Sequence, residues 1–258
     1  PLSRKSYPKQ FSNLIGNKTL FQESALRLTS SKQIKFFPHV TLTNHDFRFI
    51  IGEQLQEVGL DLGHILIEPE GKNTASAILA ASIFTHSKDK EAILLVAPCD
   101  HLIPDRKKFH DAIAIGLEQV QNKKIVTFGI KPTEPQTGYG YIKANSEGEK
   151  RAVISFTEKP DFKTAERYLA EGNYYWNSGI FVVRAGKCIN SFKQHQPELY
   201  KASKECWDHR EINEDEITLR KAYLEKIPSI SVDYAILEKE ANIAMVPFEG
   251  HWSDVGSW

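Results

Sequence analysis

The stretch AILLVAPCDH, residues Ala92 to His101, decides the fold class that the sequence predicts. Its six successive apolar residues are too few for a long helix and are closed by Pro98, which is typical of a central strand buried on both faces. Asp100 follows at once. Because open parallel α/β sheets bind ligands outside the carboxyl ends of their strands, Asp100 is a candidate for the chemistry. The alternative is that Asp100 only ends the strand, or caps a helix expected from about Lys107 to Asn122.

Length and composition describe an ordinary globular chain. It has 258 residues, 41% of them hydrophobic and 26% charged, enough to bury one substantial core in one large domain or two small ones. Thirty-three basic and thirty-three acidic residues cancel, so we expect neither nucleic acid nor a membrane as a partner. No apolar run reaches the ~20 residues of a membrane span and no signal peptide opens the chain, so a cytoplasmic location is expected.

Cysteine and histidine spacing gives no framework for a disulfide or a structural zinc site. Cys99, Cys188 and Cys206 are odd in number and far apart, which predicts free thiols. The nine histidines show no HxH or HExxH spacing. His101 stands out because it follows Asp100, although a histidine at a strand end is more often structural.

Strands and helices alternate over the first 130 residues. A Thr19–Gln22 capping box begins one helix, Asn44 can cap a second, and Asn73 or Thr74 can cap a third over 75–82. Strands are expected at 40–43, 65–67 and 124–130. This alternation predicts the α/β class, with a doubly wound, mostly parallel, Rossmann-like sheet flanked by helices.

The second half of the chain does not keep this alternation of strands and helices. We expect strands over 152–160 and 242–248 and another that ends at Arg184, with helical segments at 164–171, 186–204 and 231–240. The acidic tract 211–216 is expected to be a solvated loop. Gly138 and Gly140 in TGYGYI would let the backbone approach a flat ligand, or would form only a turn and a bulge.

Two segments could bind phosphates or a base. The turn EPEGKN, residues 68–73, leads from a strand into a helix whose free N–H groups and positive dipole suit a base edge or a phosphate. It could equally be a routine connection. Near the start, Arg4, Lys5 and Lys9 could hold a polyphosphate, or belong to a solvated terminus.

Two carboxylates far apart in the sequence, Asp100 and Asp254, each follow a predicted strand. Such a pair would favour a hard divalent cation, and Mg²⁺ normally takes one or two carboxylates plus substrate phosphate oxygens. Lys9 and Lys159 would then supply charge for the phosphates, whereas Glu158 with Asn177 could bind neutral hydroxyls. A single charged residue in a loop is usually just solvated, so only the joint pattern predicts a site.

The whole chain resembles a known enzyme family in its motifs. They are, in order, PLSRKSYPKQF, FRFIIGEQL, EPEGKNTASA, APCDH, GYGYI, FTEKP, WNSGIF, SVDYAILEK and WSDVGSW. Together they resemble the sugar-nucleotide pyrophosphorylases, and specifically bacterial mannose-1-phosphate guanylyltransferases, including the nucleotidyltransferase region of the bifunctional enzymes that are also mannose-6-phosphate isomerases. The resemblance implies that α-D-mannose 1-phosphate attacks the α-phosphorus of GTP in line, giving GDP-mannose and diphosphate for polysaccharide or lipopolysaccharide synthesis.

The resemblance also implies residue roles. Asp100 and Asp254 would hold Mg²⁺, Lys9 would reach the triphosphate, and Lys159 would contact the sugar phosphate or the α-phosphate, which makes these four the expected catalytic set. The nucleotide would further contact Glu68, Gly71, Asn73 and Thr74. The sugar would lie against Gly138, Glu158, Lys159, Asn177 and Asp233.

Three expectations concern the extent of the protein. The resemblance divides 1–258 into a nucleotide-binding lobe over about 1–130 and a sugar-binding lobe over about 131–258, and it allows a homodimer. The family's glycine-rich loop, resembling GGSGTRLW, should immediately precede Pro1, and many relatives continue beyond Trp258. Any isomerase activity of a parent protein is expected to lie outside these residues.

The sequence leaves two alternative functions. A catalytically silent nucleotide-sugar-binding module would suit a chain without the phosphate loop, but it has no evident need for two metal carboxylates. A dinucleotide-dependent oxidoreductase is disfavoured because no GxGxxG follows a strand.

Overall fold

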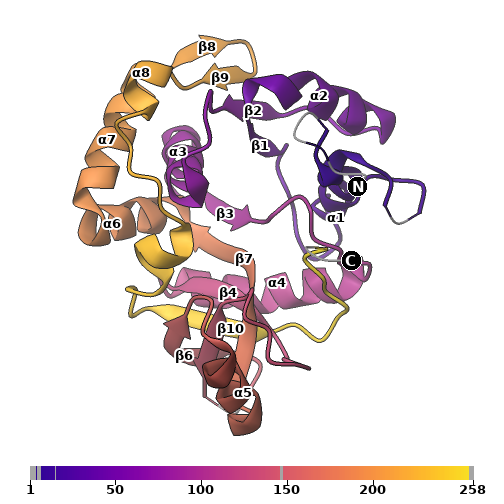
Figure 1. Cartoon of the computed structure of the whole chain (residues 1–258). Helices are drawn as coiled ribbons and strands as arrows, with labels where there is room; N and C mark the ends of the chain where they lie inside the picture. Colours follow the sequence, from indigo (N-terminus) through magenta and orange to yellow (C-terminus); the bar gives the residue numbers. More distant parts are fainter. Residues whose placement is uncertain (1–3, 5–6, 15, 146–147, 256–258) are drawn as a thin grey trace.

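The fold is built on two sheets with helices around them, as the computed structural model in Figure 1 shows. The structure describes residues 4, 7–14, 16–145 and 148–255. The smaller sheet has the order β1-β2-β9-β8, in which β1 (Val40–Thr43), β2 (His64–Ile67) and β9 (Glu216–Thr218) are parallel and β8 (Glu211–Asn213) is antiparallel to β9. The β8–β9 hairpin corrects the solvated loop expected over 211–216, because Ile217 is buried and anchors that segment beside β2.

The larger sheet has the order β3-β7-β4-β10-β6-β5, and β7 also pairs with β5. Its strands are β3 (Ile93–Val96), β4 (Ile125–Ile130), β5 (Tyr141–Ala144), β6 (Arg151–Thr157), β7 (Tyr174–Arg184) and β10 (Ile243–Pro247). The α/β class is confirmed. The expectation of mostly parallel pairing is wrong for this sheet, where only β4 and β10 are parallel. The reason is that the short β5–β6 connection forces a hairpin and the long β7 runs back against β3, β4 and β5.

The strand expected at the centre of the fold lies at the end of its sheet. Within the described part of the chain, β3 forms a ladder with β7 alone. Ile93 is 39% exposed and the other residues of β3 are only half-buried, so the prediction of burial on both faces is wrong. The strand buried at every position is β4, because β7 and β10 flank it and helix α4 covers one face.

The helices pack on both sides of these sheets and on one another. Helices α3, α6 and α7 form one layer with each other, while α4 lies against β4, β10 and β7. Their bounds are α1 (Leu20–Arg27), α2 (Arg48–Glu57), α3 (Asn73–Lys88), α4 (Arg106–Gln121), α5 (Phe162–Glu171), α6 (Ala185–His195), α7 (Pro197–Asp208) and α8 (Lys221–Leu224). Short 3-10 turns occupy Lys9–Phe11 and His45–Phe47, and a single π-helical turn occupies Asp233–Leu237. None of the helices in the described ranges is both long and apolar enough to cross a membrane.

The helix caps show which polar side chains have a structural role at a helix end. The Thr19–Gln22 capping box is confirmed, and Asn44 caps the turn before α2. The cap of α4 is Asp105, whose side chain accepts from the Lys108 amide, so Asp100 does not serve as that cap. The cap expected at Asn73 or Thr74 is wrong.

Helix α3 instead begins after Lys72 with no side-chain cap, and Asn73 adopts a left-handed backbone with φ 65°. The Thr74 hydroxyl accepts from the Val232 amide at 2.8 Å, which ties the start of α3 to the segment before the π-helical turn. The Thr74 side chain at the start of α3 therefore makes a tertiary contact and does not cap the helix.

Candidate active site

Asp100 and Asp254 lie on two loops that are joined by a short antiparallel bridge. Leu102 and Ser253 exchange backbone hydrogen bonds of 2.8 and 3.1 Å. This bridge brings the loop after β3 beside the loop after β10. The two loops that carry the predicted carboxylates therefore lie side by side, and both carboxylates act electrostatically on His101.

Lys9 joins this pair from the start of the chain. Its Nζ lies 3.0 Å from Asp100 Oδ2 and donates to the backbone carbonyls of Asp254 and Val255 at 3.1 and 3.2 Å. Lys9 and Asp100 are each about two-thirds buried, with side-chain exposures of 27% and 32%. One ammonium group therefore occupies the point where oxygens from both loops converge.

Aromatic side chains hydrogen-bond to Asp254 and His101. The Tyr139 hydroxyl donates to Asp254 Oδ1 at 2.9 Å, and burial together with this carboxylate raises the pKa of Tyr139 to about 12. The Trp252 indole donates to His101 Nδ1 at 3.3 Å. Because an indole N–H can only donate, His101 Nδ1 is an acceptor and its proton lies on Nε2. Burial lowers the pKa of His101 to about 4, against the pull of both carboxylates, so the ring is neutral at pH 7.

Cys99, next to Asp100, is not a nucleophile. It is a free thiol, as are the two other cysteines, which confirms that prediction. Burial and the neighbouring carboxylate raise the pKa of the Cys99 thiol to about 12, so it stays protonated.

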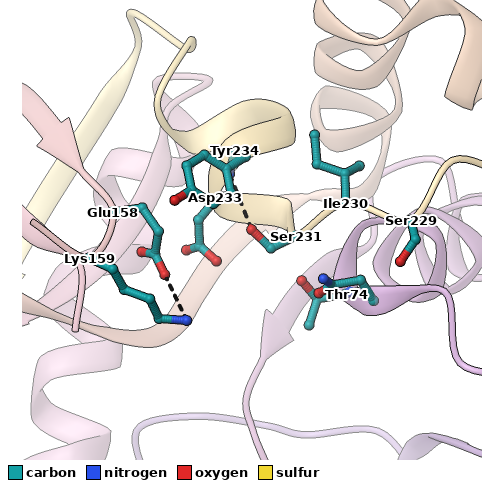
Figure 2. A pocket seen from close by; sticks show the side chains of 9 residues that line it. Thr74, Glu158, Lys159, Ser229, Ile230, Ser231, Asp233 and Tyr234 are labelled. Carbon is teal, nitrogen blue, oxygen red and sulfur yellow. Dashed lines mark hydrogen bonds and ion pairs between the residues drawn. The ribbon is translucent and has the colours of Figure 1, made fainter. Parts of the chain in front are cut away.

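Two adjoining cavities lie beyond the Asp254 loop. The larger, of about 390 Å³, opens between the start of α3 and the π-helical turn, and Figure 2 shows Glu158 and Lys159 on one side with Thr74 opposite. The smaller, of about 180 Å³, extends from Pro98 and His101 to Asn177 and Trp252. The residues that line both cavities are Glu158, Lys159 and Asp233.

These shared residues form a compact charged group. Glu158 follows β6 and Lys159 has a left-handed backbone with φ 45°, which turns the chain at the end of the strand. Lys159 Nζ lies 3.5 Å from Glu158 Oε1, and the Lys159 side chain is 61% exposed, so an anion from solvent can reach it. Burial raises the pKa of both Glu158 and Asp233, and repulsion from Asp233 adds to the rise at Glu158.

Asn177 completes the floor of the smaller cavity. Its side-chain nitrogen donates to Asp233 Oδ1 at 3.0 Å, and its backbone N–H donates to the Gly140 carbonyl at 2.8 Å. An added Cβ at Gly140 would come within 2.5 Å of Glu158 Oε2, so any larger residue there would displace the carboxyl end of Glu158. A carboxylate, an amide and an ammonium thus face one small space, a set that can bind several hydroxyls and a phosphate.

The structure gathers most of the predicted site residues. The residues from the predicted set that line the two cavities are Asn73, Thr74, Gly138, Glu158, Lys159, Asn177, Asp233 and Asp254. Lys9 and Asp100 join them through the Asp254 loop. Of the three basic residues near the start, Arg4 is exposed and Lys5 lies outside the described residues, as does Gly256 in the last motif.

Glu68 and Gly71 line neither of the two cavities. Glu68 is only 9% exposed, and its carboxylate accepts a hydrogen bond from the Ser76 hydroxyl in α3 at 3.2 Å. Burial raises the pKa of Glu68 to about 7. This hydrogen bond holds the Glu68 side chain against α3, whereas Gly71 is exposed in the turn before that helix.

The two cavities are also lined by residues from outside the predicted set, among them Tyr139, Trp252 and the 229–231 segment. Tyr139 and Trp252 both pack on the smaller cavity, with ring centroids 5.3 Å apart. Their only sequence signal is their position inside the GYGYI and WSDVGSW motifs, in which the glycines and the aspartate carry the prediction. Ser229 to Ser231 carries no motif. Two contacts with the start of α3 bring it to the larger cavity, because the Ala75 N–H donates to the Ile230 carbonyl at 3.2 Å and the Val232 N–H donates to the Thr74 hydroxyl.

The oxygen donors near Asp100 suit a hard cation. The Asp100 carboxylate and the Asp254 carbonyl already share one cation, the Lys9 ammonium, and the Asp254 carboxylate lies in the same loop. Two carboxylates with room for substrate oxygens match the ligands that Mg²⁺ takes in proteins. Within the described part of the chain, no group of three or more His, Cys, Asp or Glu residues forms a fuller metal site.

Comparison with known proteins places the whole chain in one family model, described as "Nucleotidyl transferase", which matches residues 1–258. Among curated relatives, the xanthan biosynthesis protein XanB of Xanthomonas campestris is 42% identical over 258 residues, and a mannose-1-phosphate guanylyltransferase of Klebsiella pneumoniae is 37% identical over 263 residues. Each match covers 100% of this chain and 55% of the relative. The chain therefore spans about half the length of these relatives.

Solved structures agree with that match. The crystal structure named mannose-6-phosphate isomerase from Helicobacter pylori is 30% identical, with a TM-score of 0.88 and 96% of each chain covered. A structure from Thermus thermophilus named mannose-1-phosphate geranyltransferase is 29% identical, with a TM-score of 0.83, covering 100% of this chain and 72% of that one.

Proposed function

The chain belongs to the nucleotidyl transferase family, and from this premise we propose that it joins GTP and α-D-mannose 1-phosphate to give GDP-mannose and diphosphate. The observation that carries the proposal is the convergence of Asp100, Asp254 and Lys9 beside a cavity lined by Glu158 and Asn177. The relatives named as mannose-1-phosphate guanylyltransferases support the choice of guanine and mannose.

The reaction needs alignment and charge more than acid–base chemistry. A phosphate oxygen of the sugar phosphate forms a bond to the α-phosphorus of GTP while the bond to the β-phosphate breaks, and diphosphate leaves with that electron pair. Because the sugar phosphate is already anionic at pH 7, no general base is required. We assign to Lys9 and Lys159 the neutralisation of the phosphates.

We further propose Mg²⁺ as the cofactor, held by Asp100 and Asp254. When bound, it would supply positive charge to the phosphate oxygens. Lys9 would then donate to a phosphate oxygen in place of Asp100 Oδ2, because an ammonium group can donate to a phosphate oxygen as well as to a carboxylate oxygen. Tyr139 would keep Asp254 in place, and His101 would offer its Nε2 proton to a substrate oxygen.

For the sugar, we assign Glu158, Asn177 and Asp233 to the hydroxyls and Gly138 to a backbone contact. For the nucleotide, we assign Asn73 and Thr74, at the start of α3, to the base side. The division into a nucleotide-binding and a sugar-binding lobe, the homodimer and the cytoplasmic location remain predictions. Light scattering on the purified protein would test the dimer.

Diphosphate release is the test of the activity. The assay would combine Mg²⁺, mannose 1-phosphate and each of the four nucleoside triphosphates, with this chain and with the longest form of the protein that contains it. Release that is selective for GTP and lost in Asp100→Asn and Asp254→Asn, but kept in the exposed control Asp61→Asn, is the expected result. Silence with every triphosphate in the longer form would refute it.

Two other results would point to other functions. Unchanged binding of GDP-mannose without turnover would favour a silent nucleotide-sugar-binding module. Because a solved structure of similar length carries the name mannose-6-phosphate isomerase, the same preparations should also be given mannose 6-phosphate. Formation of fructose 6-phosphate by this chain alone would contradict the expectation that such an activity lies elsewhere.

A further inference from the structure

Strand β4 carries a single hydroxyl among its six buried residues. Thr127 is 1% exposed, and its Oγ1 lies 3.0 Å from the side-chain oxygen of Asn177 and 3.3 Å from the Ile180 carbonyl. A threonine hydroxyl has one proton to donate. Because the contact with Asn177 is the shorter one, the Thr127 hydroxyl donates this proton to the Asn177 side-chain oxygen. A buried hydroxyl thus acts on a cavity residue from the interior of the sheet.

An irregularity in β7 makes this contact reachable. Thr127 pairs with Phe181 and Gly129 pairs with Asn177, so β7 holds extra residues between the two pairs. Gly179, inside this bulge, has a left-handed backbone with φ 71°, a conformation that favours glycine. The bulge turns the Asn177 side chain so that one end meets β4 and the other faces the cavity.

The neighbours of Asn177 determine which way its amide is turned. The Gly179 N–H, which can only donate, lies 3.3 Å from Asn177 Oδ1, and the Thr127 hydroxyl approaches the same oxygen. On the other side, Asn177 Nδ2 donates to the Asp233 carboxylate. A reversed amide would oppose donor to donor at Gly179 and acceptor to acceptor at Asp233.

We propose that Thr127 is a positioning residue for sugar recognition, which fixes the Asn177 amide so that its NH₂ group serves Asp233 and the cavity. The inference rests on the proposed function, since it concerns the hydroxyls that the same cavity would bind. Asn177 Nδ2 has a second proton for a ligand oxygen, and Asp233 offers acceptors beside it. Because both groups are held in place, the sugar would meet a donor from Asn177 next to an acceptor from Asp233.

The size of the effect follows from one hydrogen bond. A net contribution of about 0.5 to 1.5 kcal/mol corresponds to a change of about two- to tenfold in an equilibrium constant. Because the hydroxyl does not touch the triphosphate side of the site, the loss should fall on the sugar phosphate alone.

The experiment compares Thr127→Val, which keeps the shape but removes the donor, with Thr127→Ser, which keeps the donor. In the longest form of the protein, the valine variant should raise KM for mannose 1-phosphate about two- to tenfold and leave KM for GTP unchanged. It should also narrow the preference for mannose 1-phosphate over glucose 1-phosphate. The serine variant should restore both values, and Thr218→Val in the other sheet is the matched control.

Kinetics equal to wild type in Thr127→Val would overturn the inference, as would equal losses for GTP and sugar phosphate that serine does not rescue. If wild type turns over no sugar phosphate, the proposed function fails, and the positioning of Asn177 by Thr127 is then decided by NMR. The Asn177 side-chain NH₂ signal, assigned with Asn177→Asp, should exchange with solvent faster in Thr127→Val than in Thr127→Ser. Equal exchange rates would overturn it.

Discussion

Replacing Glu68 by glutamine tests whether this carboxyl is a buried structural group or a nucleotide ligand. The carboxyl is 9% exposed, and the described contacts give it one side-chain partner, the Ser76 hydroxyl. A single neutral donor does not replace the hydration that the ionised form loses on burial. The pKa of Glu68 is therefore raised from 4.5 to about 7.

The sign and size of the stability effect follow from this pKa. Below pH 4.5 the group is protonated in both the folded and the unfolded chain, so it has no pH-dependent effect. Above that pH the unfolded chain ionises first, and the free energy of unfolding falls by about 1.4 kcal/mol per pH unit until the folded pKa near 7 is passed. The total loss is about 3 kcal/mol.

Urea unfolding of wild type and Glu68→Gln at several pH values between 4.5 and 8 would measure this. The difference in free energy of unfolding, variant minus wild type, should rise by about 3 kcal/mol across that range, because glutamine does not ionise. Any constant cost of the substitution leaves this pH dependence unchanged. The control is Glu70→Gln, which removes an exposed carboxyl two residues away and should give a flat difference.

A flat difference for Glu68→Gln, or the same slope in Glu70→Gln, would refute the reasoning. A second measurement concerns function. If the carboxyl is buried as described, the Glu68→Gln protein should keep the preference of wild type for GTP over the other triphosphates. Loss of that preference with no pH-dependent change in stability would restore Glu68 to the nucleotide site.

Three further predictions concern the site and its scaffold. Gly140→Ala should lower kcat/KM at least tenfold with little change in Tm, because the new Cβ would displace the flexible carboxyl end of Glu158; full activity would contradict this. Tyr139→Phe removes the hydrogen bond to Asp254 and should weaken Mg²⁺ binding, followed by calorimetry, about 10- to 100-fold; unchanged affinity would count against Asp254 as a ligand. Asp161→Ala removes the N-cap of α5 and should cost about 1 kcal/mol, lowering Tm by about 2–4 °C without changing KM; an unchanged Tm would show that the cap contributes nothing.

The sequence predicted local structure where local chemistry decides it. The Thr19–Gln22 box, the strand at 125–130 and the left-handed Gly172 at the end of α5 all follow from side chains within a few residues of one another. The α/β class follows from the alternation of apolar periods. The same local patterns placed Asp100 and Asp254 after strands, which was enough to expect a pair of carboxylates.

Strand direction and strand position were not predictable in this way. Six apolar residues at 92–97 are equally suited to a central strand and to β3, which pairs with β7 alone in the described part. The acidic tract 211–216 has the composition of a solvated loop, whereas β2, the strand beside which β9 places this segment, lies far earlier in the chain. Pairing depends on partners far along the chain, which periodicity does not encode.

By itself, then, the sequence determined the residue types of the site and the segments that carry them. Only the tertiary structure decided how they meet: the Leu102–Ser253 bridge joins the two carboxylate loops, and the bulge in β7 brings Asn177 to Thr127. It also placed Glu68 outside the lining of the two cavities, beside Ser76 of α3. Side-chain direction is set by packing and by backbone hydrogen bonds between distant strands, and no pattern along one strand contains that information.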